Sequence, residues 1–147
     1  MSTVDADRRA ARVAAGMMAR DAFSRWLGIE ILEIAAARCT CRMTVRPEMV
    51  NGFGVAHGGI AFSLADSAFA FACNSGGMVT VSIENAVTYP SAVHAGDVLT
   101  AAAQEEAASN RISYYRAEVR NQRDEVVAMF RGTAYRTARE HPEAAAG

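Results

Sequence analysis

The sequence predicts an α+β fold in which a sheet of six strands wraps one long central helix. That helix is expected within Gly58–Gly76, a stretch that is apolar nearly all the way round, as is typical of a helix buried on every side. Two strand-like runs precede the helix and four follow it. Because such a helix must be covered, and six strands are available to cover it, a layered arrangement of sheet and helix is favoured.

The length of 147 residues fits a single domain, 1–147, in which residues 1–7 and 140–147 are expected to be flexible. A hydrophobic share of 51% allows a packed core, and a net charge of −1 gives no general attraction to nucleic acid or to membranes. No apolar run approaches the roughly 18 residues of a membrane-spanning helix. The charged N-terminus does not resemble a secretory signal. The three cysteines cannot all pair and are expected to be reduced core thiols, so a cytoplasmic location is expected.

The first expected element is a helix over Arg8–Phe23, which Asp5 or Asp7 can cap. It is rich in Ala, Met and Arg, which are good helix formers. Trp26 and Leu27 are expected to dock the end of this helix on the body of the protein.

Two strand-like runs follow, Gly28–Ala37 and Arg38–Arg46, and Pro47 ends the second. The second run alternates clearly. Its apolar face holds Cys39, Cys41, Met43 and Val45.

Four strands are expected after the central helix, and the last three form an antiparallel meander because short turns join them. Their expected ranges are Val79–Tyr89, Val98–Ala107, Ile112–Asn121 and Val126–Arg136. In the first of the four, alternation places one set of apolar residues on a single face: Val79, Val81, Ile83 and Val87.

Asp66 is the exception in the central helix. It carries a charge in mid-helix, and no Lys or Arg lies anywhere in Gly58–Gly76. A buried carboxylate without a partner is costly. Asp66 therefore either faces a wet cavity or has a chemical role.

The start of the central helix is also unusual, because His57-Gly58-Gly59 lacks the Ser, Thr, Asp or Asn that normally caps a helix. The first backbone N–H groups of a helix have no partner within it, and glycines leave them approachable. Such a terminus suits an anion, or a carbonyl oxygen that becomes negative. The alternative is that water or the side chain of Asn51 satisfies these groups.

Within one chain, Asp66 and the Gly58-Gly59 start of the central helix are too far apart to act on the same group. Asp66 lies seven residues after Gly59, a rise of roughly 10 Å along the helix, whereas reacting atoms must come within about 3–3.5 Å. An antiparallel helix from a two-fold dimer would bring a second Asp66 to this N-terminus.

Four stretches carry a family pattern. Asn51–Asp66 reads N-G-x-G-x-x-H-G-G-x-x-F-x-L-A-D, and Ala68–Ser75 continues as A-F-A-x-A-C-N-S. With Ala95–Ala101 and Val127–Gly132, they resemble the PaaI-type hot-dog-fold acyl-CoA thioesterases, a family of the phenylacetate pathway. The resemblance covers nearly the whole chain after Trp26.

The resemblance implies a hot-dog fold, with an antiparallel sheet around the central helix, that associates edge to edge as a homodimer and often as a homotetramer. It implies hydrolysis of an acyl-CoA thioester to free acid and CoA, with phenylacetyl-CoA and hydroxyphenylacetyl-CoA as typical substrates. No cofactor is expected. No metal is expected either, because the sequence lacks a metal-ligand cluster.

The resemblance also assigns roles to residues. Asp66 matches the catalytic carboxylate, supplied by the other subunit, and Gly58 matches the residue whose N–H polarises the thioester carbonyl. Asn51 matches a residue that holds the carbonyl or the water, and His57 matches a histidine that orients groups. The chain departs from some relatives at Ala70, where they carry a hydroxyl that positions water.

Four further residues are candidates for substrate binding. Gly59 shares the helix terminus, and Phe62, one turn before Asp66, belongs either to the core or to the substrate wall. Arg111 and Arg131 either meet the CoA phosphates or have ordinary surface roles.

Several alternatives stay open. Asp66 either deprotonates a water or attacks the carbonyl directly. Other readings of the same pattern are a hot-dog hydratase or dehydratase, which pairs a histidine with a carboxylate, and a non-catalytic acyl-CoA-binding protein.

Overall fold

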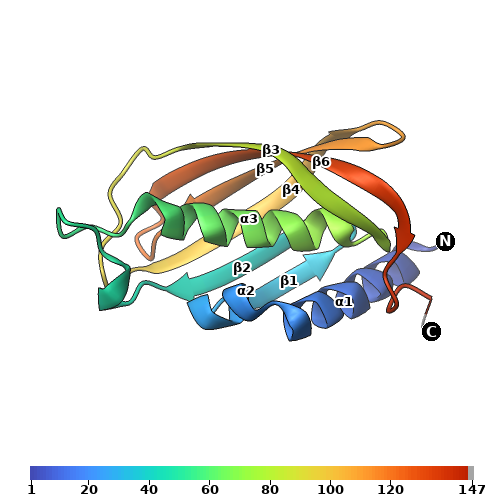
Figure 1. Ribbon diagram of the computed structural model, residues 1–147, viewed down its shortest axis with the longest axis horizontal. Coiled ribbons are helices and arrows are strands. Elements are labelled where there is room, and N and C mark those ends of the chain that lie inside the picture. Colours follow the sequence, from blue (N-terminus) through green and yellow to red (C-terminus); the bar gives the residue numbers. More distant parts are fainter. Residues whose placement is uncertain (146–147) are drawn as a thin grey trace.

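The computed structural model describes residues 1–145, and in it a curved antiparallel sheet wraps around helix α3 (Gly58–Asn74) (Figure 1). The sheet order is β1-β2-β4-β5-β6-β3, and every neighbouring pair is antiparallel. The strands are β1 (Glu30–Ala35), β2 (Arg38–Thr44), β3 (Met78–Thr88), β4 (Val98–Ala108), β5 (Ile112–Arg120) and β6 (Val126–Glu140). The predicted α+β fold, with its sheet around a central helix, is confirmed.

The core lies between α3 and the inner face of the sheet. Leu64, Phe69 and Phe71 of α3 are almost fully buried, as is Phe130 of β6. Burying a side chain of this size stabilises the fold by about 1.5–3 kcal/mol. Gly132 leaves room for this packing, because a Cβ there would lie 2.8 Å from the ring of Phe69.

Helix α1 (Thr3–Arg20) begins earlier than the expected range Arg8–Phe23. Its N-cap is Ser2, whose side chain accepts the N–H of Asp5. The expected cap at Asp5 or Asp7 is therefore wrong, and part of the segment 1–7 that was expected to be flexible is helical.

Helix α2 (Ala22–Leu27) is separate from α1, because the chain turns at Asp21. The Asp21 carboxylate accepts the N–H of Ser24 and caps α2. Leu27 docks on the core as expected, but Trp26 is 61% exposed, so its expected docking is wrong. In Figure 1, both helices lie along one side of the molecule, near β1.

Strand β3 is an edge of the sheet and does not follow the expected alternation. Its pairing with β6 shifts register twice, once between Met78 and Thr80 and once between Ser82 and Glu84. Thr80 is consequently buried, whereas Val81 and Ile83 are 45% and 56% exposed. An open apolar edge of this kind is a template for pairing with another strand.

The C-terminal segment 140–147, expected to be flexible, contacts the body of the protein through His141 and Glu143. Strand β6 continues to Glu140, and the buried ring of His141 lies with Nε2 2.7 Å from Oδ1 of Asn74. The Glu143 carboxylate pairs with Arg20 at 2.6 Å. Residues 146–147 lie outside the described residues. Over residues 1–145, no helix combines the length and apolar character that crossing a membrane requires.

Candidate active site

At the start of α3, the backbone N–H of Gly58 has no partner within residues 1–145. His57 is the N-cap, and its ring Nδ1 accepts the N–H of Gly59 at 2.9 Å. Because Nδ1 accepts, the proton of a neutral ring is on Nε2. Within residues 1–145 no acceptor faces the N–H of Gly58. Of the two N–H groups expected to be approachable, only that of Gly58 therefore remains open among residues 1–145, because that of Gly59 donates to His57.

Tyr89, just after β3, fixes the other side of Gly58. Its hydroxyl donates to the Gly58 carbonyl oxygen at 2.7 Å, and burial raises the pKa of Tyr89, which keeps the hydroxyl protonated. A Cβ on residue 58 would lie 3.2 Å from Cζ and Oη of Tyr89, so this close approach favours glycine. A cavity of about 260 Å³ opens here, and its lining includes His57, Gly58, Ala61, Tyr89 and Val93.

Asn51 does not cap α3. It lies in the loop that the Val50–Ala56 bridge closes, ahead of the helix, and its Oδ1 accepts the N–H of Phe53 at 2.8 Å. The alternative in which Asn51 satisfies the helix terminus is therefore wrong for this conformation. Its side-chain oxygen instead shapes the loop that leads to His57.

Asp66 lies half-buried on α3 and is held by one neutral donor. Nδ2 of Asn85, on β3, donates to Oδ1 of Asp66 at 3.2 Å. Burial raises the pKa of Asp66, the Asn85 hydrogen bond partly opposes this, and the charge of Asp21 adds to the rise. No ion pair among residues 1–145 includes Asp66. The carboxylate is therefore oriented without being neutralised.

A buried chain of hydrogen bonds fixes α3 at the residue after Asp66. The Oγ atoms of Ser24 and Ser67 are 2.8 Å apart, and Ser24 Oγ donates to the Asp21 carboxylate at 2.6 Å. Since the carboxylate only accepts, the hydroxyl proton of Ser24 points to Asp21, and Ser67 donates to Ser24. This chain ties α2 to the middle of α3.

One chain does not bring the two halves of the expected site together. Gly58 and Asp66 are eight residues apart on the same straight helix, a rise of about 12 Å. That separation exceeds the reach of a single water or a direct attack.

Phe62 belongs to the core side of the site. Its ring packs against Phe130 with centroids 5.7 Å apart, and Phe130 is almost fully buried. The remaining exposed part of Phe62 is one turn before Asp66, so both of the roles considered for it remain compatible with its position.

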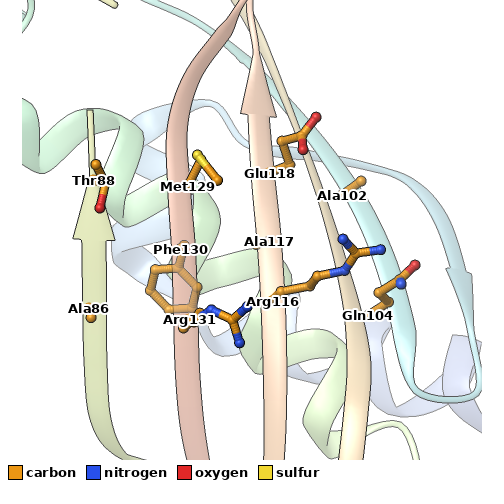
Figure 2. A pocket seen from close by; sticks show the side chains of 10 residues that line it. All are labelled: Ala86, Thr88, Ala102, Gln104, Arg116, Ala117, Glu118, Met129, Phe130 and Arg131. Carbon is orange, nitrogen blue, oxygen red and sulfur yellow. The ribbon is translucent and has the colours of Figure 1, made fainter. Parts of the chain in front are cut away.

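Neither of the two candidate arginines lies beside Asp66 in the same chain. Phe130 faces α3, so Arg131, the next residue of β6, points to the opposite face of the sheet. There it pairs with Glu106 at 2.9 Å, beside a hollow of about 390 Å³. Figure 2 shows its guanidinium extending across the strands toward Arg116 in this hollow.

Arg111 lies at the opposite end of the molecule from Gly58. Its carbonyl accepts the N–H of Arg136, and Arg136 pairs with Thr80. Thr80 in turn is hydrogen-bonded to Asn74, the last residue of α3. Arg111 is therefore near the C-terminal end of α3.

Sequence reasoning missed Asn85 and Tyr89, the two residues of the β3 region that contact the site. Asn85 did give a signal, since alternation places it on the face of Val87, where an apolar side chain is expected. Tyr89 gave none, because its contact with Gly58 depends on the path of the sheet around the helix. Over residues 1–145 no three His, Cys, Asp or Glu side chains are grouped to hold a metal ion.

Comparison with known proteins identifies the family. A family model described as the thioesterase superfamily matches residues 53–128. Acyl-coenzyme A thioesterase PaaI of Escherichia coli (strain K12) is 40% identical over 120 residues, which cover 82% of this chain and 86% of that protein.

Solved structures agree with this match. The structure of the E. coli PaaI protein from the phenylacetic acid degradation operon superposes with a TM-score of 0.89 and 37% identity, covering 91% of this chain and 97% of that one. A mutant of the phenylacetic acid degradation protein PaaI from Thermus thermophilus superposes with a TM-score of 0.76 and 36% identity, covering 80% of this chain and 100% of that one.

The wrapped helix, together with these matches, defines the class of protein, a thioester hydrolase built on the hot-dog fold. More specifically, the chain belongs to the thioesterase superfamily, and among the proteins it resembles are the PaaI proteins.

Proposed function

We propose that the chain hydrolyses an acyl-CoA thioester, most readily phenylacetyl-CoA or hydroxyphenylacetyl-CoA, to free acid and CoA. The observation that carries the proposal is that α3 holds a half-buried carboxylate and an open N-terminus. Within residues 1–145 no cation neutralises Asp66, and no acceptor pairs with the N–H of Gly58, the first residue of the helix. The acyl group is inferred from the E. coli relative, whose name specifies acyl-coenzyme A and whose structure is attributed to a phenylacetic acid degradation operon.

In this proposal Gly58 and Asp66 act on the same carbonyl group. The N–H of Gly58 donates to the carbonyl oxygen as it becomes negative, which is the role a helix N-terminus suits. Asp66 either takes a proton from the attacking water or attacks the carbonyl carbon itself. In either case the new C–O bond replaces the C–S bond, and the thiolate of CoA leaves and takes up a proton. Direct attack leaves an anhydride between the acyl group and Asp66, which a water then hydrolyses to the free acid and the regenerated carboxylate.

His57 and Asn51 have supporting roles in the same proposal. Because Nδ1 of His57 accepts the N–H of Gly59, His57 shapes the helix terminus and has only Nε2 free for substrate. Asn51 keeps its amide nitrogen available to the thioester or to water, while its oxygen holds the preceding loop.

We propose further that each site is shared between two subunits, in a homodimer that can pair again as a homotetramer. The exposed apolar edge of β3 supports this, because antiparallel pairing of two β3 strands buries Val81 and Ile83 and sets two α3 helices side by side in opposite directions. Asp66 of one chain then approaches Gly58 of the other. Contacts of Arg111 or Arg131 with the CoA phosphates would likewise come from another subunit.

Thiol release from a panel of CoA esters tests the activity. The panel holds arylacetyl, benzoyl and straight-chain esters, and the Asp66→Asn variant is assayed beside the wild type. We expect hydrolysis of arylacetyl esters with the highest kcat/KM and a loss of at least about 100-fold in the variant. Near-normal turnover by Asp66→Asn would remove Asp66 from the mechanism, and binding of esters without hydrolysis would indicate a binding protein.

Mixed oligomers test the shared site. Asp66→Asn chains and Gly58→Val chains, each inactive alone, are unfolded, mixed and refolded together. If each site uses Gly58 of one chain and Asp66 of the other, every mixed dimer has one intact site, and random pairing gives about a quarter of wild-type activity. No recovery, with mixed dimers demonstrated by mass spectrometry, would place both groups in one chain.

A further inference from the structure

Three side chains form a line that ends at the Asp66 carboxylate. Ser82 Oγ donates to Asn85 Oδ1 at 2.8 Å, and Asn85 Nδ2 donates to Asp66 Oδ1 at 3.2 Å. Two of the three residues come from β3 and one from α3. The line therefore joins the open edge of the sheet to the middle of the helix.

The direction of the line is fixed by its last member. An Asn side chain can turn its oxygen or its nitrogen toward a neighbour, and a Ser hydroxyl can either donate or accept. Because the ionised carboxylate of Asp66 only accepts, the amide nitrogen of Asn85 faces Asp66. The amide oxygen therefore faces Ser82, whose hydroxyl donates to it.

The backbone of β3 is adapted to this arrangement. At the register shift, β3 advances by two residues, from Ser82 to Glu84, while its partner β6 advances by only one, from Ala134 to Thr133. A bulge of this kind re-aims the side chains that follow it. Downstream of the shift, Asn85 is half-buried and turned to α3, whereas Ala86 lines the hollow on the opposite face.

We infer that Asn85 is a positioning residue for the hydrolysis, which holds Oδ1 of Asp66 and leaves Oδ2 as the oxygen that acts on water or on the carbonyl carbon. The inference rests on the proposed function. The next turn of the helix carries Ala70, which offers no hydrogen bond, so the polar support of Asp66 comes from the sheet.

A neutral donor suits this position better than a cation would. The titratable groups that face Asp66 are Asp21, from the junction of α1 and α2, and Cys73, from α3 itself. Neither is cationic, and Asn85, from β3, adds no charge. An Arg or Lys in place of Asn85 would lower the pKa of Asp66 and weaken it as a base.

The test compares Asn85→Asp with Asn85→Leu, two variants of nearly the same size. In Asn85→Asp, two carboxyl groups at hydrogen-bond distance cannot both ionise, so the apparent pKa rises and the acid limb of kcat/KM moves up by about one pH unit or more. Its activity recovers as the pH rises. In Asn85→Leu, kcat falls about 10-fold with little change in KM, and raising the pH does not restore it.

Two more variants complete the design. Ser82→Ala removes the hydrogen bond that holds the amide oxygen of Asn85, and we expect a smaller loss of kcat than in Asn85→Leu. Thr88→Ala is the matched control, because Thr88 is on the same strand but lines the hollow on the opposite face of the sheet (Figure 2), so its pH profile should equal that of the wild type.

The outcomes separate this inference from the proposed function. If Asp66→Asn is inactive but Asn85→Asp has the wild-type pH profile, the positioning role is wrong and the thioesterase proposal stands. If Asp66→Asn keeps full activity, both are wrong. A shifted acid limb in Asn85→Asp shows that residue 85 lies against Asp66 in the active enzyme, and a kcat loss in Asn85→Leu with little change in KM then supports the positioning role.

Discussion

Adding one methyl group at Gly58 tests whether the start of α3 is built to place its N–H. In Gly58→Ala the new Cβ lies 3.2 Å from both Cζ and Oη of Tyr89, whereas ordinary carbon contacts lie at about 3.5–4.0 Å. The ring and the helix start must therefore separate by a few tenths of an ångström. The N–H of residue 58 itself is retained.

The size of the effect follows from how Tyr89 is held. Tyr89 is 45% exposed, so its ring can move outward, but moving it breaks the 2.7 Å hydrogen bond to the Gly58 carbonyl. Losing such a bond costs about 0.5–1.5 kcal/mol, and overpacking costs about 1–3 kcal/mol in a less mobile site. Because a misplacement of about 1 Å lowers rates about 100-fold, we expect kcat to fall about 10- to 100-fold.

Thiol-release kinetics on the best arylacetyl ester measure the loss, and second-site variants identify its cause. Tyr89→Ala removes the obstructing ring and should restore much of kcat in the Gly58→Ala background. Tyr89→Phe keeps Cζ in place and should not. Gly52→Ala is the control, because a Cβ there meets nothing within 4 Å.

Two results would refute this reasoning. Full activity of Gly58→Ala would show that the N–H of residue 58 needs no accurate placement. A double variant no better than Gly58→Ala alone would show that the methyl group blocks the substrate directly rather than through Tyr89.

Two further predictions concern stability. Asp66→Asn should stabilise the fold at neutral pH while abolishing activity, because burial raises the pKa of Asp66 and ionisation therefore costs folding free energy. The stability difference from wild type should be smallest near about pH 3, where Asp66 is mostly protonated in both the folded and the unfolded state. It should grow as the pH rises above the ordinary Asp pKa of about 3.9 and level off once the pH exceeds the raised pKa of the folded state. Urea unfolding at several pH values measures the difference, and a constant difference would contradict the prediction. Gly132→Ala should lower the free energy of unfolding by about 1–3 kcal/mol, because its Cβ would lie 2.8 Å from the Phe69 ring and 3.0 Å from that of Phe130, both almost fully buried. Each kcal/mol lowers Tm by about 3 °C in a domain of this size. Gly76→Ala is the control, because a Cβ there meets nothing within 4 Å. An unchanged Tm of Gly132→Ala would show that the two rings can move apart without loss of stability.

The elements and their order were predictable, because periodicity and turn residues report the burial of regular structure. The errors occur where tertiary contacts override local pattern. Asp21 was expected inside one helix, yet its side chain caps a second one, a choice that depends on where Ser24 meets Ser67 on α3. His141 was assigned to a flexible tail, because nothing in its own segment reveals that Asn74 accepts its ring N–H.

Strand β3 shows the same limit in the site itself. Strict alternation predicted that Val81 and Ile83 share one face of the strand with Val79 and Val87. The pairing with β6 instead shifts register twice, and Thr80 is buried while Val81 and Ile83 are exposed. A bulge adds one residue to one strand of a pair, so its position depends on the partner strand and is not encoded by the period of either strand alone. Asp66 and Gly58 were candidates from the sequence because each departs from the residues around it, whereas the contact of Asn85 with Asp66 became visible only once β3 had been placed against α3.

In the proposed mechanism, the apolar surroundings of Asp66 would make it a stronger base. A carboxylate in water has a pKa well below neutral and is a weak base. Burial in α3 and the nearby charge of Asp21 both raise the pKa of Asp66, which improves it as a base near neutral pH, while Asn85 limits the rise and fixes one oxygen. The same burial makes the charge costly, so an ionised Asp66 gains from any positive potential that comes within reach. In the proposed dimer, the N-terminus of a second, antiparallel α3 would offer that potential, together with the N–H of Gly58, which has no acceptor within residues 1–145. Pairing two chains along β3 would therefore stabilise the ionised carboxylate and complete the site in one step, and a monomer would carry the energetic cost of Asp66 without its use.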